Sequence, residues 1–259
     1  MLEAQGLTLR RGDGLALDAV DFAVRRGEFV AVIGPNGAGK SSLLGALSGA
    51  LRPSEGAVRI DGGNPARFGA RQLSRKRAVL EQNPEGALGF ALIELAQFAI
   101  PREIAPAEAR RIAESALEAV GLRAMSRRLV RHLSGGERHR GHMARALAQL
   151  RAGRALGAGE WLLLDEPTAS LDLAHQGAIL RAARAAADEG AGVLAVLHDP
   201  SLAAAFADRV ALMAAGRIVA DGAPEAVLTP ERLGALYGVP VHIGRAGGAL
   251  AITPLHQKH

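Results

Sequence analysis

The stretch GPNGAGKS, residues 34–41, constrains the fold of this chain more than any other feature. It matches the pattern G-x-x-x-x-G-K-[ST], in which glycines allow successive backbone N–H groups to point at phosphate oxygens. The apolar run Phe29–Ile33 precedes it, and leucines at helical spacing follow it from Lys40 onward. We therefore predict a buried strand, a phosphate-binding turn and a helix whose positive N-terminal end assists anion binding.

The residue types in this turn suit a nucleoside triphosphate and its metal ion. Lys40 can reach the β- and γ-phosphates, Ser41 can offer its hydroxyl to Mg²⁺, and Ser42 can add a phosphate contact. A chance glycine-rich loop is the alternative, and the predicted strand and helix on either side disfavour it. The residues expected to bind the phosphates are Gly34, Pro35, Asn36, Gly37, Ala38, Gly39, Lys40, Ser41 and Ser42.

An acid pair ends the apolar run LLLDE, residues 162–166. We expect Asp165 to hold Mg²⁺, mostly through water, and Glu166 to lie beside the attacking water as general base. Phosphoryl transfer depends above all on positioning and on charge neutralisation, and these two residues supply both. A solvated acid pair at a strand end is the alternative, which the phosphate loop upstream disfavours.

Two further polar residues follow predicted strands. His198 comes after the apolar run in GVLAVLHD, residues 192–199, and we expect it to sense the γ-phosphate rather than to serve a structural role. Gln82 follows the short strand predicted at Ala78–Leu80 and could touch Mg²⁺ or the attacking water. Its spacing alone leaves a purely structural role equally open.

The rest of the chain alternates between strand and helix patterns, without an internal repeat. Residues 92–150 are mostly helical, with helices expected over 106–122 and 135–150, and strands return at Trp161–Pro167 and Gly192–Asp199. Residues 209–222 predict a hairpin with its turn at Ala215-Gly216. We predict a surface loop for Arg151–Glu160 and find no periodicity from about Gly238 onward.

Strands separated by helical patterns favour an α/β fold with a mostly parallel sheet. We predict one domain with a core formed by residues 1–86 and 158–237. Residues 87–157 form the expected helical subdomain, and 238–259 a C-terminal tail to which we assign no function. The composition, 49% hydrophobic and 22% charged, provides for a substantial core.

Composition and charge exclude several classes of protein. No apolar run approaches the length that spans a bilayer, the N-terminus lacks a signal-peptide pattern, and there is no cysteine, so we expect a cytoplasmic protein without disulfides. The formal charge is +5, but aromatic residues make up only 3% of the chain. We therefore expect a solvated arginine-rich surface and no nucleic-acid partner.

A second candidate anion site is LSGGE, residues 133–137, at the start of the helix expected from residue 135. Ser134 and Glu137 have the spacing of a capping box, in which each side chain bonds the backbone N–H of the other residue. A capping box alone does not explain the pair Gly135-Gly136.

The ordered set GPNGAGKS, Gln82, LSGGE, LLLDEP, SLD and LHD resembles the nucleotide-binding subunits of ABC transporters. The resemblance covers roughly Leu2 to Val239, and LSGGE is its discriminating motif because other P-loop NTPases lack it. It implies a P-loop NTPase (RecA-like) core with a mostly parallel sheet, an N-terminal antiparallel β part and an inserted α-helical subdomain. It also implies hydrolysis of ATP, with Mg²⁺, coupled to transport.

The same resemblance implies partners. Two copies would pair head to tail, so that Ser134, Gly135 and Gly136 bind the γ-phosphate on the partner's loop, with Asp172 of SLD at the dimer seam. The helical insertion, with Gln82 at its hinge, would carry movement to two transmembrane permease subunits. A periplasmic or surface substrate-binding protein would act indirectly, and the chain would sit peripherally on the cytoplasmic face of the inner membrane.

One stretch departs from the family pattern. The family usually stacks adenine on an aromatic ring near the N-terminus, and LTLRRGDG places Arg11 at that position. A guanidinium group can also stack on a purine, so Arg11 is included among the expected ATP-binding residues.

Finer features bear on the cargo. The stretches DLAHQ and HDP and the interrupted ALAQL…LLLDEP resemble the ATPase subunits of hemin importers, with iron-siderophore or cobalamin importers as alternatives. The segment NPEGALGFALIELAQFAI after Gln82 departs from the FPF-type sequence of hemin relatives. His175 in DLAHQ is expected to be a polar residue near the dimer seam rather than a heme ligand.

Two rival functional classes are disfavoured by the sequence. ABC ATPases of translation usually carry two cassettes, and those of chromosomes split the cassette with a coiled coil, but this chain has neither a duplication nor sustained heptads. A P-loop kinase or GTPase is disfavoured by LSGGE and by the lack of an NKxD motif.

Overall fold

The computed structural model describes residues 1–259 except 13, 83–85, 87, 170 and 256–259. The strands are β1 (Leu2–Arg11), β2 (Gly14–Val24), β3 (Phe29–Ile33), β4 (Glu55–Ile60), β5 (Arg77–Leu80), β6 (Trp161–Asp165), β7 (Gly192–Val196), β8 (Arg209–Ala214), β9 (Arg217–Gly222), β10 (Val241–Ala246) and β11 (Ala249–Pro254). The α-helices are α1 (Lys40–Leu47), α2 (Ala70–Lys76), α3 (Leu92–Gln97), α4 (Pro106–Ala119), α5 (Gly135–Ala155), α6 (Leu173–Asp188), α7 (Pro200–Phe206), α8 (Pro224–Val227) and α9 (Pro230–Tyr237). Short 3₁₀ turns lie at η1 (Pro65–Arg67), η2 (Arg123–Met125) and η3 (Val130–His132).

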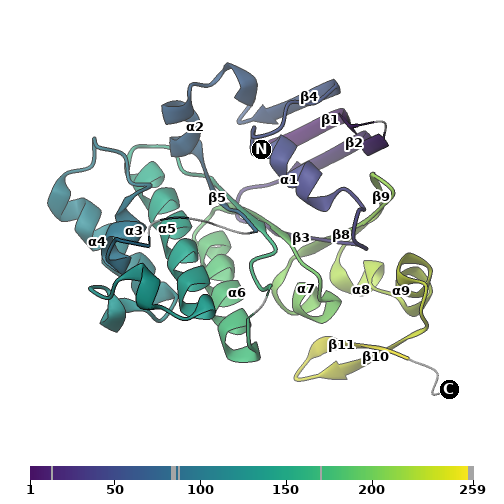
Figure 1. The fold of residues 1–259 in the computed structure, drawn as a ribbon. Helices are drawn as coiled ribbons and strands as arrows, with labels where there is room; N and C mark the ends of the chain where they lie inside the picture. The colour runs from purple at the N-terminus through teal and green to yellow at the C-terminus, as the bar shows by residue number, and fades with distance from the viewer. Residues whose placement is uncertain (13, 83–85, 87, 170, 256–259) are drawn as a thin grey trace.

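A six-stranded sheet runs through the middle of the molecule in the order β5-β6-β7-β3-β8-β9 (Figure 1). All neighbouring pairs are parallel except β8 and β9, which form the predicted antiparallel hairpin. The carboxyl ends of β5, β6, β7 and β3 therefore meet along one edge, which is where ligands bind in open α/β sheets. The predicted mostly parallel sheet is confirmed.

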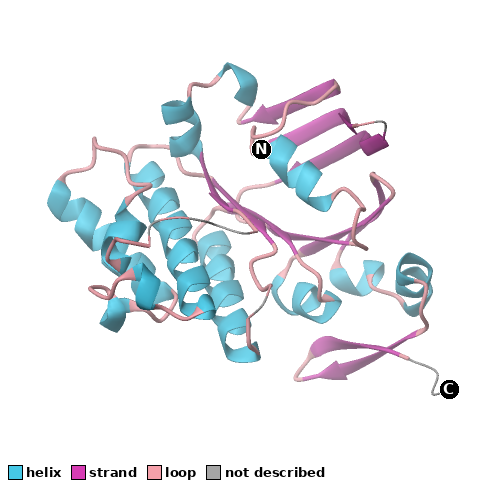
Figure 2. Cartoon of the chain, viewed as in Figure 1, coloured by secondary structure: helices cyan, strands magenta, loops and turns pink. Residues whose placement is uncertain are grey.

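Both faces of this sheet are covered. The side chains of β3 alternate, with Phe29, Ala31 and Ile33 in one hydrophobic cluster and Val30 and Val32 in another. The first cluster lies against helices, including α5 and α6, and the second against α1 and the N-terminal strands (Figure 2). A strand buried on both faces reads as a continuous apolar run, as FVAVI does.

The N-terminal strands form a separate antiparallel sheet in the order β2-β1-β4. This sheet shares a hydrophobic cluster with α1, to which Leu2, Leu17 and Leu43 contribute fully buried side chains. The N-terminal antiparallel part that the family resemblance implied is confirmed.

The surface loop predicted at Arg151–Glu160 is wrong over its first half. Helix α5 continues to Ala155, and within it Gly153 packs so closely on the backbone carbonyl of Arg75 that no larger residue would fit. Arg154 then donates from Nε to the carbonyl of Gly159 at 3.2 Å and so stabilises the helix end. Gly153 and Gly159 are thus required by close packing, whereas Gly157 has open space around it.

The tail beyond Gly238 contains an antiparallel hairpin, β10–β11, that the sequence did not predict. The backbone N–H of Ile252 donates to Ser201 Oγ at 3.0 Å, which ties β11 to α7. Residues 256–259 of the tail lie outside the described residues. Across the described helices, none combines the length and apolar character needed to cross a membrane.

Candidate functional site

The phosphate-binding turn lies between β3 and α1, at the carboxyl edge of the central sheet. Gly39 has φ 102°, and a Cβ there would collide with the carbonyl of Ala16 in β2, so the turn requires glycine at this position. No described side chain caps the N-terminus of α1. Its first N–H groups are therefore free to bind an anion.

Lys40 is nearly buried in this turn, and its ammonium group lies against the turn's own backbone. Nζ donates to the carbonyl of Gly34 at 2.8 Å and to that of Pro35 at 3.0 Å. Burial lowers the pKa of Lys40, while the negative charges of Glu166 and Asp165 oppose this effect. The geometry thus holds a cation where phosphate oxygens would arrive.

Asp165, the last residue of β6, faces the start of α1. Ser41 Oγ donates to Asp165 Oδ1 at 3.0 Å, although the two residues are 124 positions apart. Burial raises the pKa of Asp165, and the neighbouring charge of Glu166 adds to that effect. The structure therefore brings together the hydroxyl and the carboxylate predicted to hold Mg²⁺.

Glu166 lies at the centre of a group formed by three strand ends. Gln82 donates from Nε2 to Glu166 Oε2 at 2.6 Å, and His198 Nε2 lies 2.7 Å from Glu166 Oε1. Glu166 also has a left-handed backbone, with φ 50°, which is unusual for a residue with a side chain and typical of strained functional positions. Its position is fixed from both sides.

Oxygen ligands of this kind suit a magnesium ion. Mg²⁺ prefers one or two carboxylates together with water and substrate phosphate oxygens. No group of three or more His, Cys, Asp or Glu among the described residues could hold a metal alone. Ser41, Asp165 and Gln82 therefore fit an ion that arrives with a phosphate ligand.

LSGGE forms the expected cap of α5. Glu137 N–H donates to Ser134 Oγ at 3.2 Å, and Ser134 N–H donates to Glu137 Oε2 at 2.7 Å. A Cβ on Gly135 would meet nothing described within 4 Å, so the backbone is open there, whereas Gly136 lies against the side chains of Leu171 and His175. Among the described residues, no hydrogen bond or ion pair joins this helix start to the phosphate-binding turn.

Asp172 caps α6 and lies close to the same surface. It accepts from the N–H of His175 at 2.9 Å, and this bond, assisted by the His175 side chain, lowers the pKa of Asp172. The ring Nδ1 of His175 lies 2.8 Å from Asp172 Oδ2. His175 is thus engaged in the first turn of α6, as expected for a polar helix residue. Ser170 of SLD lies outside the described residues.

Arg11 ends β1 and is exposed. The hairpin that β1 forms with β2 comes close to the phosphate-binding turn, since Ala16 and Leu17 lie beside Gly39. Asp13, in the same stretch, lies outside the described residues. Stacking of Arg11 on adenine stays a prediction.

Sequence reasoning missed His139, on α5. A ring nitrogen of His139 lies 2.8 Å from the carbonyl of Pro167, which follows Glu166, and burial lowers the pKa of this histidine. His139 thereby joins the capped helix to the acid pair. The flanking RHR pattern resembles an exposed helix face, so it gave no signal of this contact.

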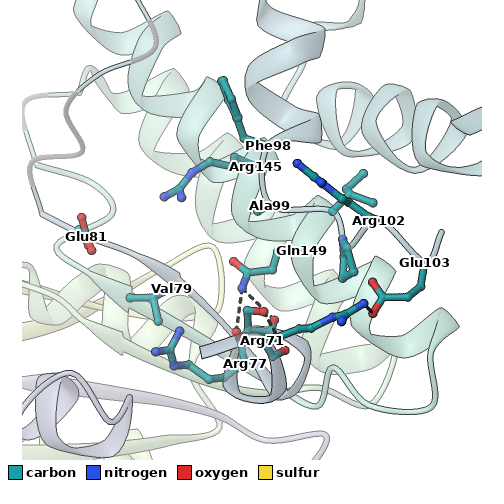
Figure 3. A pocket seen from close by; sticks show the side chains of 13 residues that line it. Arg71, Arg77, Val79, Glu81, Phe98, Ala99, Arg102, Glu103, Arg145 and Gln149 are labelled. Carbon is teal, nitrogen blue, oxygen red and sulfur yellow. Dashed lines mark hydrogen bonds and ion pairs between the residues drawn. The ribbon is translucent and has the colours of Figure 1, made fainter. Parts of the chain in front are cut away.

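A cavity of about 640 Å³ lies next to the site (Figure 3). Arg77, Arg102 and Arg145 surround it, and Glu81 is the acidic residue beside Gln82 that lines it. Arg145 Nε is buried without a hydrogen-bond partner among the described residues, and burial lowers the pKa of Arg145 although Glu81 opposes this effect. We call this cavity the arginine groove.

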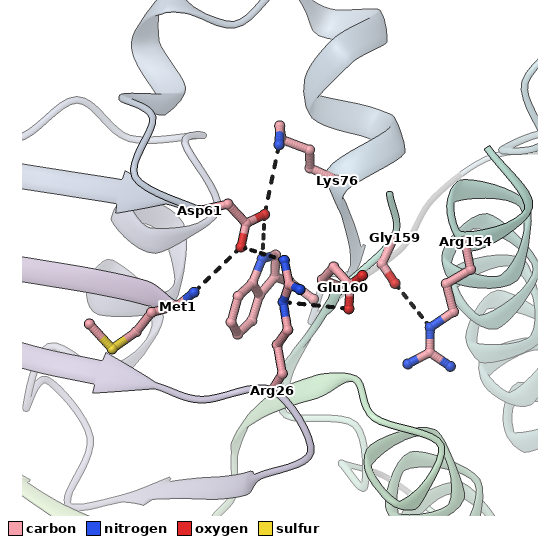
Figure 4. A network of polar contacts seen from close by, with 8 residues as sticks. Met1, Arg26, Asp61, Lys76, Arg154, Gly159 and Glu160 are labelled. Carbon is pink, nitrogen blue, oxygen red and sulfur yellow. Dashed lines mark hydrogen bonds and ion pairs between the residues drawn. The ribbon is translucent and has the colours of Figure 1, made fainter. Parts of the chain in front are cut away.

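A second cluster of charges lies at the opposite end of β6 (Figure 4). Asp61 accepts from Trp161 Nε1 at 3.3 Å and from Arg26 Nη2 at 3.1 Å, and Lys76 Nζ lies 3.7 Å away. Burial alone would raise the pKa of Asp61, but the bonds from Trp161 and Arg26 outweigh burial and lower it. This cluster joins β4, β6 and the end of α2, far from the acid pair.

Comparison with known proteins gives consistent results. The model of a family described as ABC transporter matches residues 17–169. The chain is 44% identical over 242 residues to the hemin import ATP-binding protein HmuV of Pseudomonas entomophila (strain L48), covering 93% of this chain and 94% of that protein. It is 40% identical over 254 residues to the protein of the same name from Rhodopseudomonas palustris (strain HaA2), covering 98% and 97%.

A solved structure shares the architecture. The dimeric ATP-binding cassette MJ0796, in a post-hydrolysis state bound to ADP and Pi, superposes with a TM-score of 0.75. Its sequence is 25% identical, and the match covers 86% of this chain and 99% of that chain.

Proposed function

Because this chain belongs to the ABC transporter family, we propose that it is the ATP-hydrolysing subunit of an importer whose cargo is hemin. The observation that carries the enzymatic part is the position of Glu166, held by Gln82 and His198 beside Asp165 and the phosphate-binding turn. The cargo assignment is supported by the 44% identity to a hemin import protein over nearly the whole chain.

Ser41, Asp165 and Gln82 would hold Mg²⁺, the first two being already in contact. When bound, Mg²⁺ would supply positive charge that offsets the negative charge developing on the phosphates during phosphoryl transfer. Lys40 would exchange its bonds to the carbonyls of Gly34 and Pro35 for bonds to the phosphates. The open N–H groups of α1 add to that cradle.

Glu166 is the proposed general base. Its carboxylate would orient a water molecule in line with the γ-phosphate and accept the proton of that water as the new P–O bond forms. His198, now 2.7 Å from Glu166, would contact the γ-phosphate, and Gln82 would hold either the carboxylate or the water. Gln82 and His198 would thus hold the Glu166 carboxylate in the arrangement described here, and contact the water or the γ-phosphate once ATP is bound.

We propose that each site is completed by a second copy of the chain. Ser134, Gly135 and Gly136 present an open, capped helix start that no described bond links to the turn of the same chain. In a head-to-tail pair, this surface would cover the triphosphate on the partner, with Asp172 at the seam. The dimeric state of the structural relative MJ0796 supports such a pair.

The arginine groove is the proposed docking site of a permease segment, with the chain peripheral to the cytoplasmic face of the membrane. Arg145 has an unpaired buried Nε among the described residues, so an acidic side chain of the permease would complete its bonding. Glu81 in the groove precedes Gln82 in the site, so the backbone links the two directly. A permease movement could therefore reach the proposed general base.

The cargo is tested with the assembled transporter. The chain would be purified with its permease, placed in lipid nanodiscs and assayed for ATPase activity with loaded substrate-binding proteins. We expect hemin-loaded protein to stimulate hydrolysis several-fold over the unloaded protein. Stimulation by siderophore- or cobalamin-loaded protein, with none by hemin, would contradict the hemin assignment and keep the ATPase assignment.

A further inference from the structure

Leu173 is an unusually exposed apolar side chain. It is the first residue of α6 and is 86% exposed, more than any other large hydrophobic residue in the described part of the chain. The cap of α6 is supplied by Asp172, so the helix start does not itself require a leucine. A leucine in this position points to a contact that the single chain does not make.

Leu173 belongs to the surface that includes the capped start of α5. The side chains of Leu171 and His175 lie against Gly136, where a Cβ would come within 3.4 Å and 3.8 Å of them. Residues 171–175 and 134–136 therefore form one continuous surface. Anything that binds over Gly136 comes close to Leu173 as well.

An apolar pocket lies beside His198. It has a volume of about 360 Å³ and is lined mainly by apolar side chains from α9 and the C-terminal hairpin, among them Leu233, Tyr237, Val239 and Ile252. His198 forms its polar edge.

His198 connects this pocket to the proposed hydrolytic group, because the same side chain lies 2.7 Å from Glu166. The pocket therefore borders the half of the site that holds the triphosphate, whereas Leu173 borders the half that covers the partner's triphosphate. Leu173 does not line the pocket of its own chain. In a two-fold dimer the two features would meet twice, once on each side of the axis.

Two exposed aromatic side chains have a different location. Phe90 and Phe98 pack edge to face with ring centroids 4.7 Å apart, and Phe98 lines the arginine groove. These rings belong to the face assigned to the permease. Leu173, by contrast, borders the residues proposed to face the second copy.

We infer that Leu173 of each chain inserts into the apolar pocket beside His198 of a second copy when ATP closes the dimer. The inference rests on the proposed head-to-tail dimer and adds a specific contact to it. It also gives the C-terminal hairpin a role, because the hairpin forms one wall of the pocket and is tied to α7 through Ser201. Closure would then press on the segment that carries His198.

The chain contains no cysteine, which allows a direct cross-linking test. Leu173→Cys and Val239→Cys are made separately in a Glu166→Gln background, mixed, and oxidised mildly with and without ATP. We expect a disulfide-linked dimer from the mixture with ATP, and little without it. Val219→Cys, on exposed β9, replaces Val239→Cys as the matched control and should not cross-link.

Sedimentation of the same samples separates the possible failures. If the Glu166→Gln protein dimerises with ATP but the Leu173–Val239 pair cross-links no better than the control, the inference is wrong and the dimer stands. The same holds if Leu173→Cys alone cross-links to itself faster than the mixed pair. If ATP produces no dimer at all, the head-to-tail proposal itself fails. Ser134→Arg should abolish both dimer and cross-link.

A second measurement does not depend on oxidation. Leu173→Asn should raise the protein concentration that gives half-maximal ATPase activity by about tenfold, because it removes a buried leucine contact from each half of the dimer. Leu173→Met should remain near the unmodified chain. Neither change should alter monomer unfolding, since the side chain is 86% exposed. Equal half-maximal concentrations for Asn and Met would contradict the inference.

Discussion

At the scale of single residues, Glu166 combines a left-handed backbone, which it shares with Asp61 among the described acids, with contacts to two other strand ends. Its φ of 50° is held by a bond from its N–H to the carbonyl of Val196 at 3.2 Å and by the contacts of its carboxylate with Gln82 and His198. A left-handed conformation at a residue with a side chain costs about 1–3 kcal/mol and persists only where the surroundings fix it. The fold therefore maintains a strained backbone at Glu166, and this backbone directs the carboxylate toward Gln82 and His198.

Glu166→Gln tests the role of that carboxylate. The amide has nearly the same size and can still accept one of the two hydrogen bonds, but it cannot accept a proton from water. We expect the single-turnover rate of ATP hydrolysis to fall at least about 100-fold while ATP binding persists. Rapid-quench assays and an ATP titration measure the two quantities.

Glu160→Gln is the matched control, because Glu160 pairs with Arg26 at the opposite end of β6. It should hydrolyse ATP at the unmodified rate. A Glu166→Gln protein that turns over as fast as this control would exclude Glu166 as general base.

At the scale of elements, α5 is the helix that joins most of the features described. Its start carries the Ser134 cap, His139 contacts the loop after Glu166, and Arg145 lines the arginine groove. Between them lies His142, 3% exposed, with neither ring nitrogen bonded to a described group. Burial, with smaller contributions from Arg145 and other nearby cations, lowers the pKa of His142 to about 4.

This buried histidine predicts acid sensitivity of the folded chain. His142 binds a proton more readily when unfolded, with a pKa of 6.5, than when folded, so the free energy of unfolding falls as the pH drops below 6.5 towards 4. The loss by pH 5 is about 2 kcal/mol. His142→Leu should reduce the difference in unfolding free energy between pH 7.5 and pH 5 by that amount, measured by urea unfolding followed by circular dichroism.

His132→Asn serves as the comparison, since His132 is exposed at the end of η3. The unfolding free energy of the His132→Asn variant should change with pH as that of the unmodified chain does. If His142→Leu also leaves the pH dependence unchanged, protonation of His142 does not limit stability in acid.

Elements with strong local signals were predictable from the sequence. The run Phe29–Ile33 is buried on both faces, and the Ser134 and Glu137 pair marks the start of α5, so pattern and structure agree there. The glycine in the last turns of α5 is required by a distant group, the carbonyl of Arg75, which local composition does not reveal. The β10–β11 hairpin is only partly buried on either face, so it leaves no clear alternation in the sequence.

The site was predictable as a set of residues and not as a set of contacts. Gln82, Glu166 and His198 each follow a strand, and parallel strands bring their ends to one edge. That Gln82 reaches Glu166 depends on β5 lying beside β6, which no local pattern encodes. The division of the chain into core, helical subdomain and tail stays a prediction.

At the scale of the whole molecule, two different faces would serve two kinds of partner. The strand-end edge would meet a second copy, and the arginine groove would meet the permease. Arg145→Gln should weaken the binding of permease in nanodiscs at least about tenfold, because it removes a buried charge that a permease carboxylate would pair with. Binding is measured by titrating labelled chain onto the nanodiscs, and ATPase activity without permease should persist.

Arg127→Gln is the matched control, since Arg127 is exposed and does not line the groove. It should bind permease like the unmodified chain. Equal permease affinity for the two variants would remove Arg145 from the docking site.

The burial of Trp161 has a practical consequence for fluorescence measurements. Trp161 is the one tryptophan of the sequence, and its indole is fully buried at the start of β6. Asp165 lies at the other end of that strand, roughly 13 Å away. The intrinsic fluorescence of this chain should therefore report global unfolding through a red shift in emission, and remain nearly silent when nucleotide binds.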